Sequence, residues 1–249
     1  MHNNDDTEAW NCKLSAAWAA HLRQHNLRST DTVVELGPGF SDKLARGLAT
    51  LAFCGQIVLV EPNAAAGAAA ETNYRRWLPQ AEIIRIERPL PECGSLVNHT
   101  VDVLAANHIL DDLLLHAALL PDARADLFAE MRPGADCTPS FLNAWQCLLA
   151  HPMRLEQLGE QIAEEFTHYI TALQPRLVLL NQYPSWRHAQ HGLCAIHTHA
   201  AALLPRLAAR LATSGYETAV SPATEISPAG AWLTGKKARG PAAITEKQQ

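Results

Sequence analysis

Three stretches of this chain carry residues whose types and spacing could do chemistry. The first, VVELGPGFSDKL at 33–44, places an acid and two glycines between an apolar run and a helix-like segment. The second, AANHILDDLL at 105–114, combines an amide, a histidine and two aspartates. The third, SWRHAQHGLCAIHTH at 185–199, holds four of the chain's 12 histidines and one cysteine. Each stretch needs elements that position it.

The glycines of the first stretch have a mechanical interpretation. Gly37 and Gly39 allow a sharp turn and leave no Cβ between the backbone and a ligand. Free N–H groups at the start of the following helix favour polar or anionic ligand groups. Glu61 ends the next apolar run, about twenty residues later, which is the separation expected for an acid that binds a ribose. A tight strand–helix turn that binds nothing is the alternative.

The positioning elements follow from the hydrophobic pattern. Short apolar runs rich in β-branched residues alternate with helical patterns, which predicts a doubly wound, mostly parallel α/β sheet. The predicted strands lie at 32–36, 54–62, 81–88, within 99–110 and at 176–184, and YETAVSP and GAWLTGK form a closing pair. Ser41 or Asp42 is the expected N-cap of the helix after the glycines. Pro205 is expected to kink the helix that precedes the closing pair.

These segments together resemble the Rossmann-like, class I S-adenosylmethionine-dependent methyltransferases. VVELGPGFSDKLA is similar to their first motif, VLVEP to the second and IIRIER to the third. VDVLAANHILDDL resembles their fourth-strand segment, and the closing pair resembles their terminal antiparallel hairpin. The resemblance covers about residues 30–135 and 175–236. It implies a seven-stranded sheet with a terminal antiparallel hairpin, and S-adenosyl-L-methionine as the cofactor.

The resemblance also implies which residues contact the cofactor. Glu61 would bind the ribose, Glu87 would lie on the adenine side, and the others would line the loop and the end of the fourth strand. The full expected set is Glu35, Gly37, Pro38, Gly39, Glu61, Pro62, Glu87 and Asn107.

One position departs from the family pattern. Ser41 stands where the third glycine is expected, which makes the loop bulkier but supplies a hydroxyl that can cap a helix. An NAD-binding dehydrogenase is the nearest rival for such a loop. Its GxGxxG fingerprint is not matched here, because Phe40, Ser41 and Asp42 follow the second glycine.

The second stretch supplies the candidate catalytic residues, His108 and Asp111. Residues just past a strand's carboxyl end face the cleft of an open α/β sheet. His108 is the candidate base, since its ordinary pKa lies near neutrality, and Asp111 would accept a proton or anchor an amine. Alternatively, Asp111 and Asp112 merely favour a helix N-terminus. Methyl transfer can also proceed by positioning alone, so a base is optional.

The histidine-rich third stretch is not expected to bind metal. His188, His191 and Cys194 could supply three ligands, but their spacing matches no common zinc pattern. We expect satisfied or solvated histidines that flank the same pocket.

Composition narrows the class of partner. The net charge of −5 and the lack of a Lys/Arg cluster argue against nucleic acid and membrane surfaces. No signal peptide or transmembrane run is apparent, and the 6 cysteines lack CxxC spacing, which predicts reduced thiols in the cytoplasm. A homodimer stays an open alternative.

The chain is interpreted as one Rossmann-like domain over 1–249. Residues 1–29 form a helical cap, 136–174 a helical insertion before the fifth strand that is a candidate lid, and 237–249 a flexible tail. The expected function is S-adenosylmethionine-dependent methyl transfer to a small-molecule acceptor whose identity and methylated atom the sequence does not define. The alternatives are an aminocarboxypropyl transferase using the same cofactor, and a catalytically silent cofactor-binding subunit.

Overall fold

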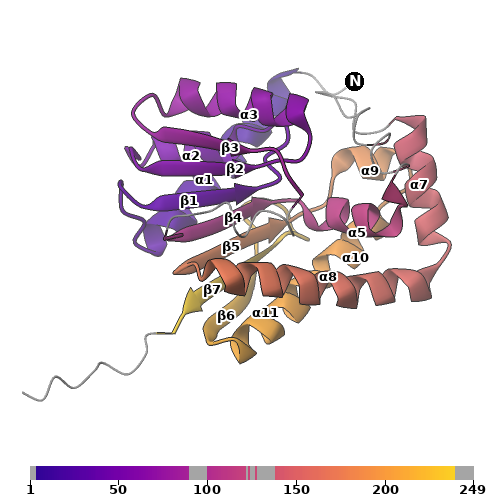
Figure 1. Cartoon of the computed structure of the whole chain (residues 1–249). Coiled ribbons are helices and arrows are strands. Elements are labelled where there is room, and N and C mark those ends of the chain that lie inside the picture. The colour runs from indigo at the N-terminus through magenta and orange to yellow at the C-terminus, as the bar shows by residue number, and fades with distance from the viewer. Residues whose placement is uncertain (1–3, 90–99, 122, 124–126, 128–137, 239–249) are drawn as a thin grey trace, which may run out of the picture.

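A seven-stranded sheet forms the centre of the protein (Figure 1). A computed structural model describes residues 4–89, 100–121, 123, 127 and 138–238. The strand order is β3-β2-β1-β4-β5-β7-β6, and β7 alone runs antiparallel to its neighbours. The strands are β1 Thr32–Leu36, β2 Gln56–Val60, β3 Glu82–Ile86, β4 Val103–Asn107, β5 Leu177–Gln182, β6 Tyr216–Pro222 and β7 Ala231–Lys237. The predicted parallel sheet with a terminal antiparallel hairpin is confirmed.

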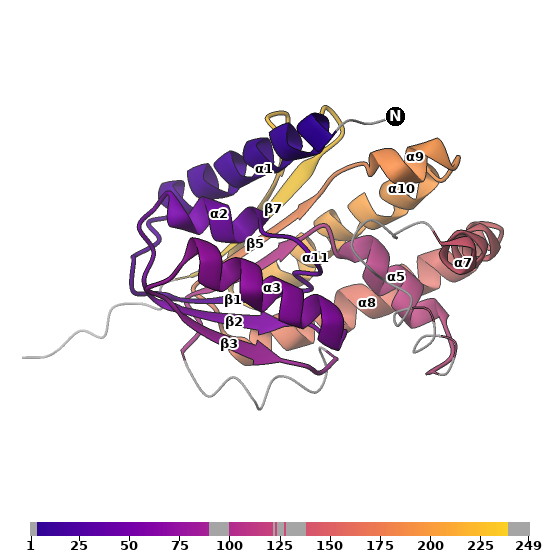
Figure 2. The same ribbon diagram turned by 90° about the horizontal axis from the view of Figure 1, so that it is seen from above.

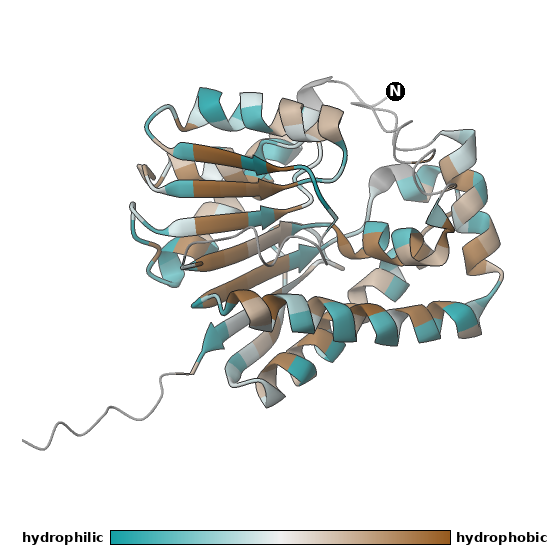
Figure 3. Ribbon diagram, in the orientation of Figure 1, coloured by the Kyte–Doolittle hydropathy of each residue, from teal (hydrophilic) through white to brown (hydrophobic). Residues whose placement is uncertain are grey.

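The central strands are apolar along most of their length because helices cover the sheet on both faces (Figure 3). Residue Val33 pairs with Ile57 on one side and with Val103 on the other. Polar residues appear where these strands end, at Asn107 and at Asn181. Each of these strands therefore changes from buried apolar residues to polar residues within one or two positions of its carboxyl end.

One face is covered by the N-terminal helix and the helices after β1 and β2 (Figure 2). Trp18 and Leu22 of the first helix are fully buried in the core on this face, together with Leu44 and Tyr74. The predicted helical cap thus packs as a regular layer of the domain. The three helices are α1 Asn4–Gln24, α2 Lys43–Ala49 and α3 Ala64–Trp77.

The opposite face is covered by helices that follow β4 and β5. The predicted helical region before the fifth strand forms two helices that each begin with a proline, α7 and α8. Ile162 and Ile170 of α8 are buried with the apolar residues of β4 and β5. The helices are α5 Leu110–Ala118, α7 Pro139–Leu149, α8 Pro152–Leu173, α9 Trp186–Gln190, α10 Ala195–Ala201 and α11 Leu203–Thr213.

One local expectation is wrong, one is met in position only, and others lie outside the described residues. The helix is interrupted at Ala202, between α10 and α11. Pro205 therefore lies in the first turn of a new helix and does not kink a continuous one. Asp42 is the N-cap residue of α2, but its side chain binds Arg46 and Trp77 and makes no cap hydrogen bond. Residues 136–137 and 239–249, at the edges of the expected insertion and tail, are not described. Within the described ranges, no helix is both long and apolar enough to cross a membrane.

Candidate functional site

The glycine loop leaves β1 at the carboxyl edge of the sheet. Gly37 and Gly39 have φ angles of +58° and +57°, a left-handed conformation that favours glycine. A Cβ at Gly37 would lie 2.9 Å from the Cγ2 atom of Ile109, whereas one at Gly39 would meet nothing within 4 Å. Gly37 is thus packed against the start of α5, and Gly39 faces open space.

The carboxylate of Glu61 is tied to this loop. Its two oxygens accept the backbone N–H groups of Gly39 and of Asn63, each at 3.0 Å. Glu61 is only 7% exposed, and burial raises the pKa of its carboxyl although the two hydrogen bonds oppose the rise. The acid predicted to close β2 therefore lies beside the second glycine, and its contact with a ribose stays a prediction.

Glu35 points the other way, into the core. The hydroxyl of Tyr74, on α3, donates a hydrogen bond to its carboxyl, and Glu35 is 3% exposed. Burial raises the pKa of Glu35 to about 8, although the bond from Tyr74 and the nearby Lys43 lower it. At least one oxygen of this expected cofactor ligand is therefore used to join β1 to α3.

The remaining expected cofactor residues differ in exposure. Pro38 is buried, and its carbonyl accepts the N–H of Ser41 at 3.1 Å within the loop. Pro62 is exposed after β2. Glu87 is also exposed, and its carboxylate pairs with Arg85 at 2.9 Å. These residues lie after β1, β2 and β3, which are neighbours in the sheet.

Asn107 links the end of β4 to two other elements. Its side-chain oxygen accepts the indole N–H of Trp18 at 3.3 Å, and its amide donates to the hydroxyl of Tyr183 at 3.3 Å. The Tyr183 hydroxyl also accepts from the Nζ of Lys43 at 3.2 Å, at the start of α2. The N-terminal helix, the glycine-loop helix and the ends of β4 and β5 therefore meet in one polar network.

His108 is held in a strained conformation beside this network. Its φ is +58°, uncommon for a residue with a side chain, and its backbone N–H donates to the carbonyl of Asn181 at 3.0 Å. The ring Nε2 lies 2.6 Å from the carbonyl of Tyr183, and Nδ1 lies 3.5 Å from the Oδ1 of Asp111. Both ring nitrogens therefore face protein acceptors.

Asp111 lies between two histidines. It is 3% exposed, and its Oδ1 accepts the side-chain amide of Gln182 at 3.4 Å. Its Oδ2 lies 3.9 Å from the Nδ1 of His188. Burial lowers the pKa of His188, which the carboxylate of Asp111 partly offsets. The second and third stretches thus meet at this aspartate.

The adjacent Asp112 also has a raised pKa. Burial is the main cause, and the negative charges of Asp111 and Glu61 raise the pKa of Asp112 further.

The other residues of the histidine-rich stretch differ in position, and of these His197 interacts electrostatically with His108 and Asp111. His191 and Cys194 are exposed, and His197 directs its Nε2 to the carbonyl of Ala229 at 2.9 Å. No group of three or more His, Cys, Asp and Glu residues in the described part of the chain has a metal-binding arrangement.

The aromatic residues of the expected lid are packed into the core. Phe141 and Trp145 of α7, and Phe166 and Tyr169 of α8, are each no more than 6% exposed. The ring of Phe141 stacks on His188 with a centroid separation of 6.1 Å. A lid role for these residues stays a prediction.

The sequence analysis missed the polar residues that end β5. Asn181, Gln182 and Tyr183 interrupt the apolar run RLVLL, at the same edge as Asn107. Neither side-chain polar atom of Asn181 has a hydrogen-bond partner among the described residues, although Asn181 is only 1% exposed. A polar pair at the end of a buried strand was the available signal. Lys43 and Trp18 carried no such local signal.

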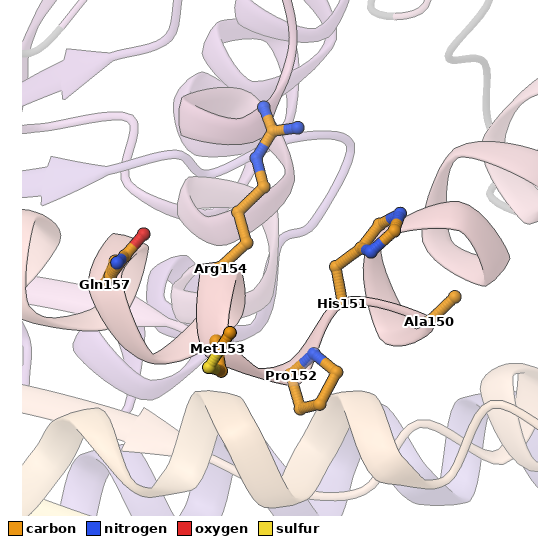
Figure 4. Close-up of a pocket in the computed structure, with 6 residues that line it drawn as sticks. All are labelled: Ala150, His151, Pro152, Met153, Arg154 and Gln157. Carbon is orange, nitrogen blue, oxygen red and sulfur yellow. The ribbon is translucent and has the colours of Figure 1, made fainter.

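A hollow of about 510 Å³ lies away from these residues, at the turn between α7 and α8 (Figure 4). Its lining is Ala150, His151, Pro152, Met153, Arg154 and Gln157. None of these residues belongs to the glycine loop, the Asn107 network or the Asp111 group. Volume alone does not make it the site of the chemistry.

Comparison with known proteins gives structural neighbours only. No protein-family model and no curated protein sequence matches the chain. The small RNA methyltransferase HEN1 superposes with a TM-score of 0.49 and 14% identity over 90% of this chain and 26% of its own. An O-methyltransferase family protein from Burkholderia thailandensis superposes with a TM-score of 0.49 and 14% identity, over 96% of this chain and 62% of its own. A SAM-dependent O-methyltransferase from Thermotoga maritima superposes with a TM-score of 0.46 and 12% identity, over 91% of this chain and 65% of its own. The chain therefore spans less than two thirds of each of these structures.

The fold is Rossmann-like, with the sheet topology that the resemblance to class I methyltransferases implied. The strand order, the single antiparallel strand β7 and the helices on both faces establish this class of fold within the described residues. A fold of this kind serves many reactions, so the function has to be argued from the site.

Proposed function

We propose that this protein binds S-adenosyl-L-methionine at the carboxyl ends of β1 and β2 and transfers its methyl group to a small-molecule acceptor. The observation that carries the proposal is the joined unit of Gly39 and Glu61. An open-faced glycine and a carboxylate lie side by side, at the edge of an α/β sheet where ligands bind.

Each part of this unit matches a part of the cofactor. The open side of Gly39 admits a ligand to the backbone, and Glu61 can accept hydrogen bonds from ribose hydroxyls. The ammonium of Lys43 supplies positive charge near the loop for the cofactor's carboxylate. Glu87, at the end of β3, is assigned to the adenine side. Glu35 is assigned a supporting role, because its carboxyl is bonded to Tyr74.

The acceptor is assigned to the space beyond β4 and β5. Asn107, His108 and Asp111 lie there, and buried polar side chains of β5 join them. Fixed positions for both reactants account for most of the rate enhancement that methyl transfer requires. The net charge of −5 and the enclosed polar groups favour a small molecule over a nucleic acid.

Product analysis tests the proposal. The protein is incubated with S-adenosylmethionine and acceptor pools, and the nucleoside products are separated by mass. S-adenosylhomocysteine is the expected product. Methylthioadenosine would instead show transfer of the aminocarboxypropyl group, and binding without turnover on any pool would show a silent subunit.

A further inference from the structure

His188 differs from His108 in how its ring is held. The hydroxyl of Ser185 accepts the backbone N–H of His188 at 3.4 Å and so fixes the first turn of α9. The ring is bounded by Phe141 on one face and by Asp111 at Nδ1. Among the described residues, none hydrogen-bonds to Nε2. Nδ1 of His188 therefore faces a carboxylate at 3.9 Å, whereas Nε2 faces no hydrogen-bonding group among the described residues.

His108 has no free nitrogen in this arrangement. A distance of 2.6 Å between its Nε2 and the carbonyl of Tyr183 requires a proton on Nε2, because a carbonyl only accepts. Its Nδ1 faces the Oδ1 of Asp111 at 3.5 Å. With Nε2 protonated, the lone pair of a neutral His108 lies on Nδ1, which faces Asp111 instead of a substrate, so His108 fits a positioning role better than that of a base.

Asp111 is placed to orient His188. Its Oδ1 is occupied by Gln182 and faces His108, which leaves Oδ2 for the Nδ1 of His188. The separation of 3.9 Å is longer than a hydrogen bond, but catalytic contacts in ligand-free proteins often tighten when substrate binds. A carboxylate that holds Nδ1–H leaves the Nε2 lone pair directed outward, the logic of a carboxylate–histidine pair.

We propose that His188, oriented by Asp111, is the general base of the methyl transfer, and that the acceptor group is a hydroxyl. The inference rests on the proposed function. A hydroxyl is a weak nucleophile until its proton is removed, whereas a neutral amine can attack without a base. An imidazole at this position is therefore of most use to an O-methylation.

The step balances as a single displacement. The acceptor oxygen attacks the methyl carbon of S-adenosylmethionine, an O–C bond forms, and the S–C bond breaks with its electron pair moving to sulfur. The sulfonium becomes the neutral thioether of S-adenosylhomocysteine. The hydroxyl proton moves to Nε2 of His188, and the resulting imidazolium then releases it to water.

The charged groups around His188 set its protonation. Asp111 on α5 favours the imidazolium, while burial, His108 and His191 disfavour it, and the net effect lowers the pKa of His188. The ring is therefore neutral at pH 7 and ready to accept a proton. Turnover should fall on the acid side of about 6.5, the ordinary value for histidine, as the ring becomes protonated.

Ring tautomers offer a test that needs no substrate. Long-range ¹H–¹⁵N spectra of the full chain should show His188 protonated at Nδ1 and bare at Nε2, and His108 protonated at Nε2. Contacts with the Phe141 ring assign His188 in the parent protein, so the test does not depend on a variant that folds. Asp111→Asn should lower the pKa of His188 further. An Nε2–H tautomer at His188, or a titration that Asp111→Asn leaves unchanged, would overturn the proposal.

Turnover supplies the second test, with a panel of phenols as probes and anilines as matched amines. His188→Gln should reduce phenol methylation by at least about 100-fold and remove the acid limb, while the affinity for S-adenosylhomocysteine stays within about twofold. His151→Gln, at the exposed turn between α7 and α8, should leave turnover unchanged. Methylation of anilines alone, or full phenol turnover by His188→Gln, would contradict the assignment. If the parent protein itself does not bind the cofactor, that result would instead refute the proposed function.

Discussion

The carboxylate of Glu61 accepts the backbone N–H of Gly39 at 3.0 Å, and this bond joins the end of β2 to the loop after β1. Two strands that are neighbours in the sheet thereby present one preformed surface. The acid is oriented before any ligand arrives, which reduces the ordering cost of binding. The predictions below follow from this unit and from the polar residues at the ends of β4 and β5.

The two loop glycines should respond differently to alanine. Both substitutions place a side chain in the left-handed region, at a cost of roughly 1–2 kcal/mol of unfolding free energy. Only Gly37→Ala also meets Ile109, at 2.9 Å, so it should destabilise the protein more. Gly39→Ala should fold and yet lose at least tenfold in affinity for S-adenosylhomocysteine, since its methyl group points into open space. Denaturant titration measures the unfolding free energy of both variants, and calorimetry measures their affinity for S-adenosylhomocysteine. Parent-like binding by Gly39→Ala would show that the loop is only a turn.

Glu35→Gln should stabilise the protein in a pH-dependent way. The pKa of Glu35 is raised from 4.5 to about 8 in the folded state, so its stabilising contribution is complete below 4.5 and is lost as pH rises through 8. The variant cannot ionise and keeps an oxygen that accepts from Tyr74. Its advantage in unfolding free energy should therefore be absent near pH 4, grow between pH 5 and 8, and reach on the order of a few kcal/mol. Chemical unfolding of both proteins across this range is the measurement, and a constant difference would disprove the buried, protonated state.

Asn181→Leu should raise stability and lower activity. Both polar atoms of the Asn181 side chain are buried without a partner among the described residues, which costs about 1–3 kcal/mol. A leucine of similar volume removes that cost and should increase the unfolding free energy by about 1 kcal/mol or more. The same change should impair turnover if the amide serves the acceptor. Asn143→Leu, at an exposed position on α7, is a comparison that should leave turnover intact. A destabilised Asn181→Leu protein would show that the amide is satisfied in solution.

The fold could be predicted from sequence because its signals are local. TVVEL is observed as β1 at the predicted residues 32–36, since a β-branched run bounded by a turn and two glycines leaves few alternatives. The parallel pairing of the strands followed from their alternation with helices. The break at Ala202 was missed because Pro205 was taken as an interruption, whereas a proline in the first turn of a helix is well tolerated.

The site was predicted less completely because its contacts are distant in sequence. Glu35 was expected to face the cofactor, but its orientation depends on Tyr74, 39 residues away on another helix. Asp111 and His188 were recognised in separate stretches that were expected to flank one pocket, but the approach of these two side chains depends on the parallel pairing of β4 with β5. The pattern of one segment cannot report which side chain arrives from another.

Cofactor binding tests the central claim most directly. Isothermal titration of S-adenosylhomocysteine should show one site per chain in the parent protein. Glu61→Ala should weaken that binding by about 1.5–3 kcal/mol, the cost of losing hydrogen bonds to a charged group, with an unchanged far-ultraviolet spectrum. Glu87→Ala serves as the matched acid at the exposed end of β3 and should have the smaller effect. Absence of binding in the parent, or equal affinity in the parent and a folded Glu61→Ala, would contradict the account.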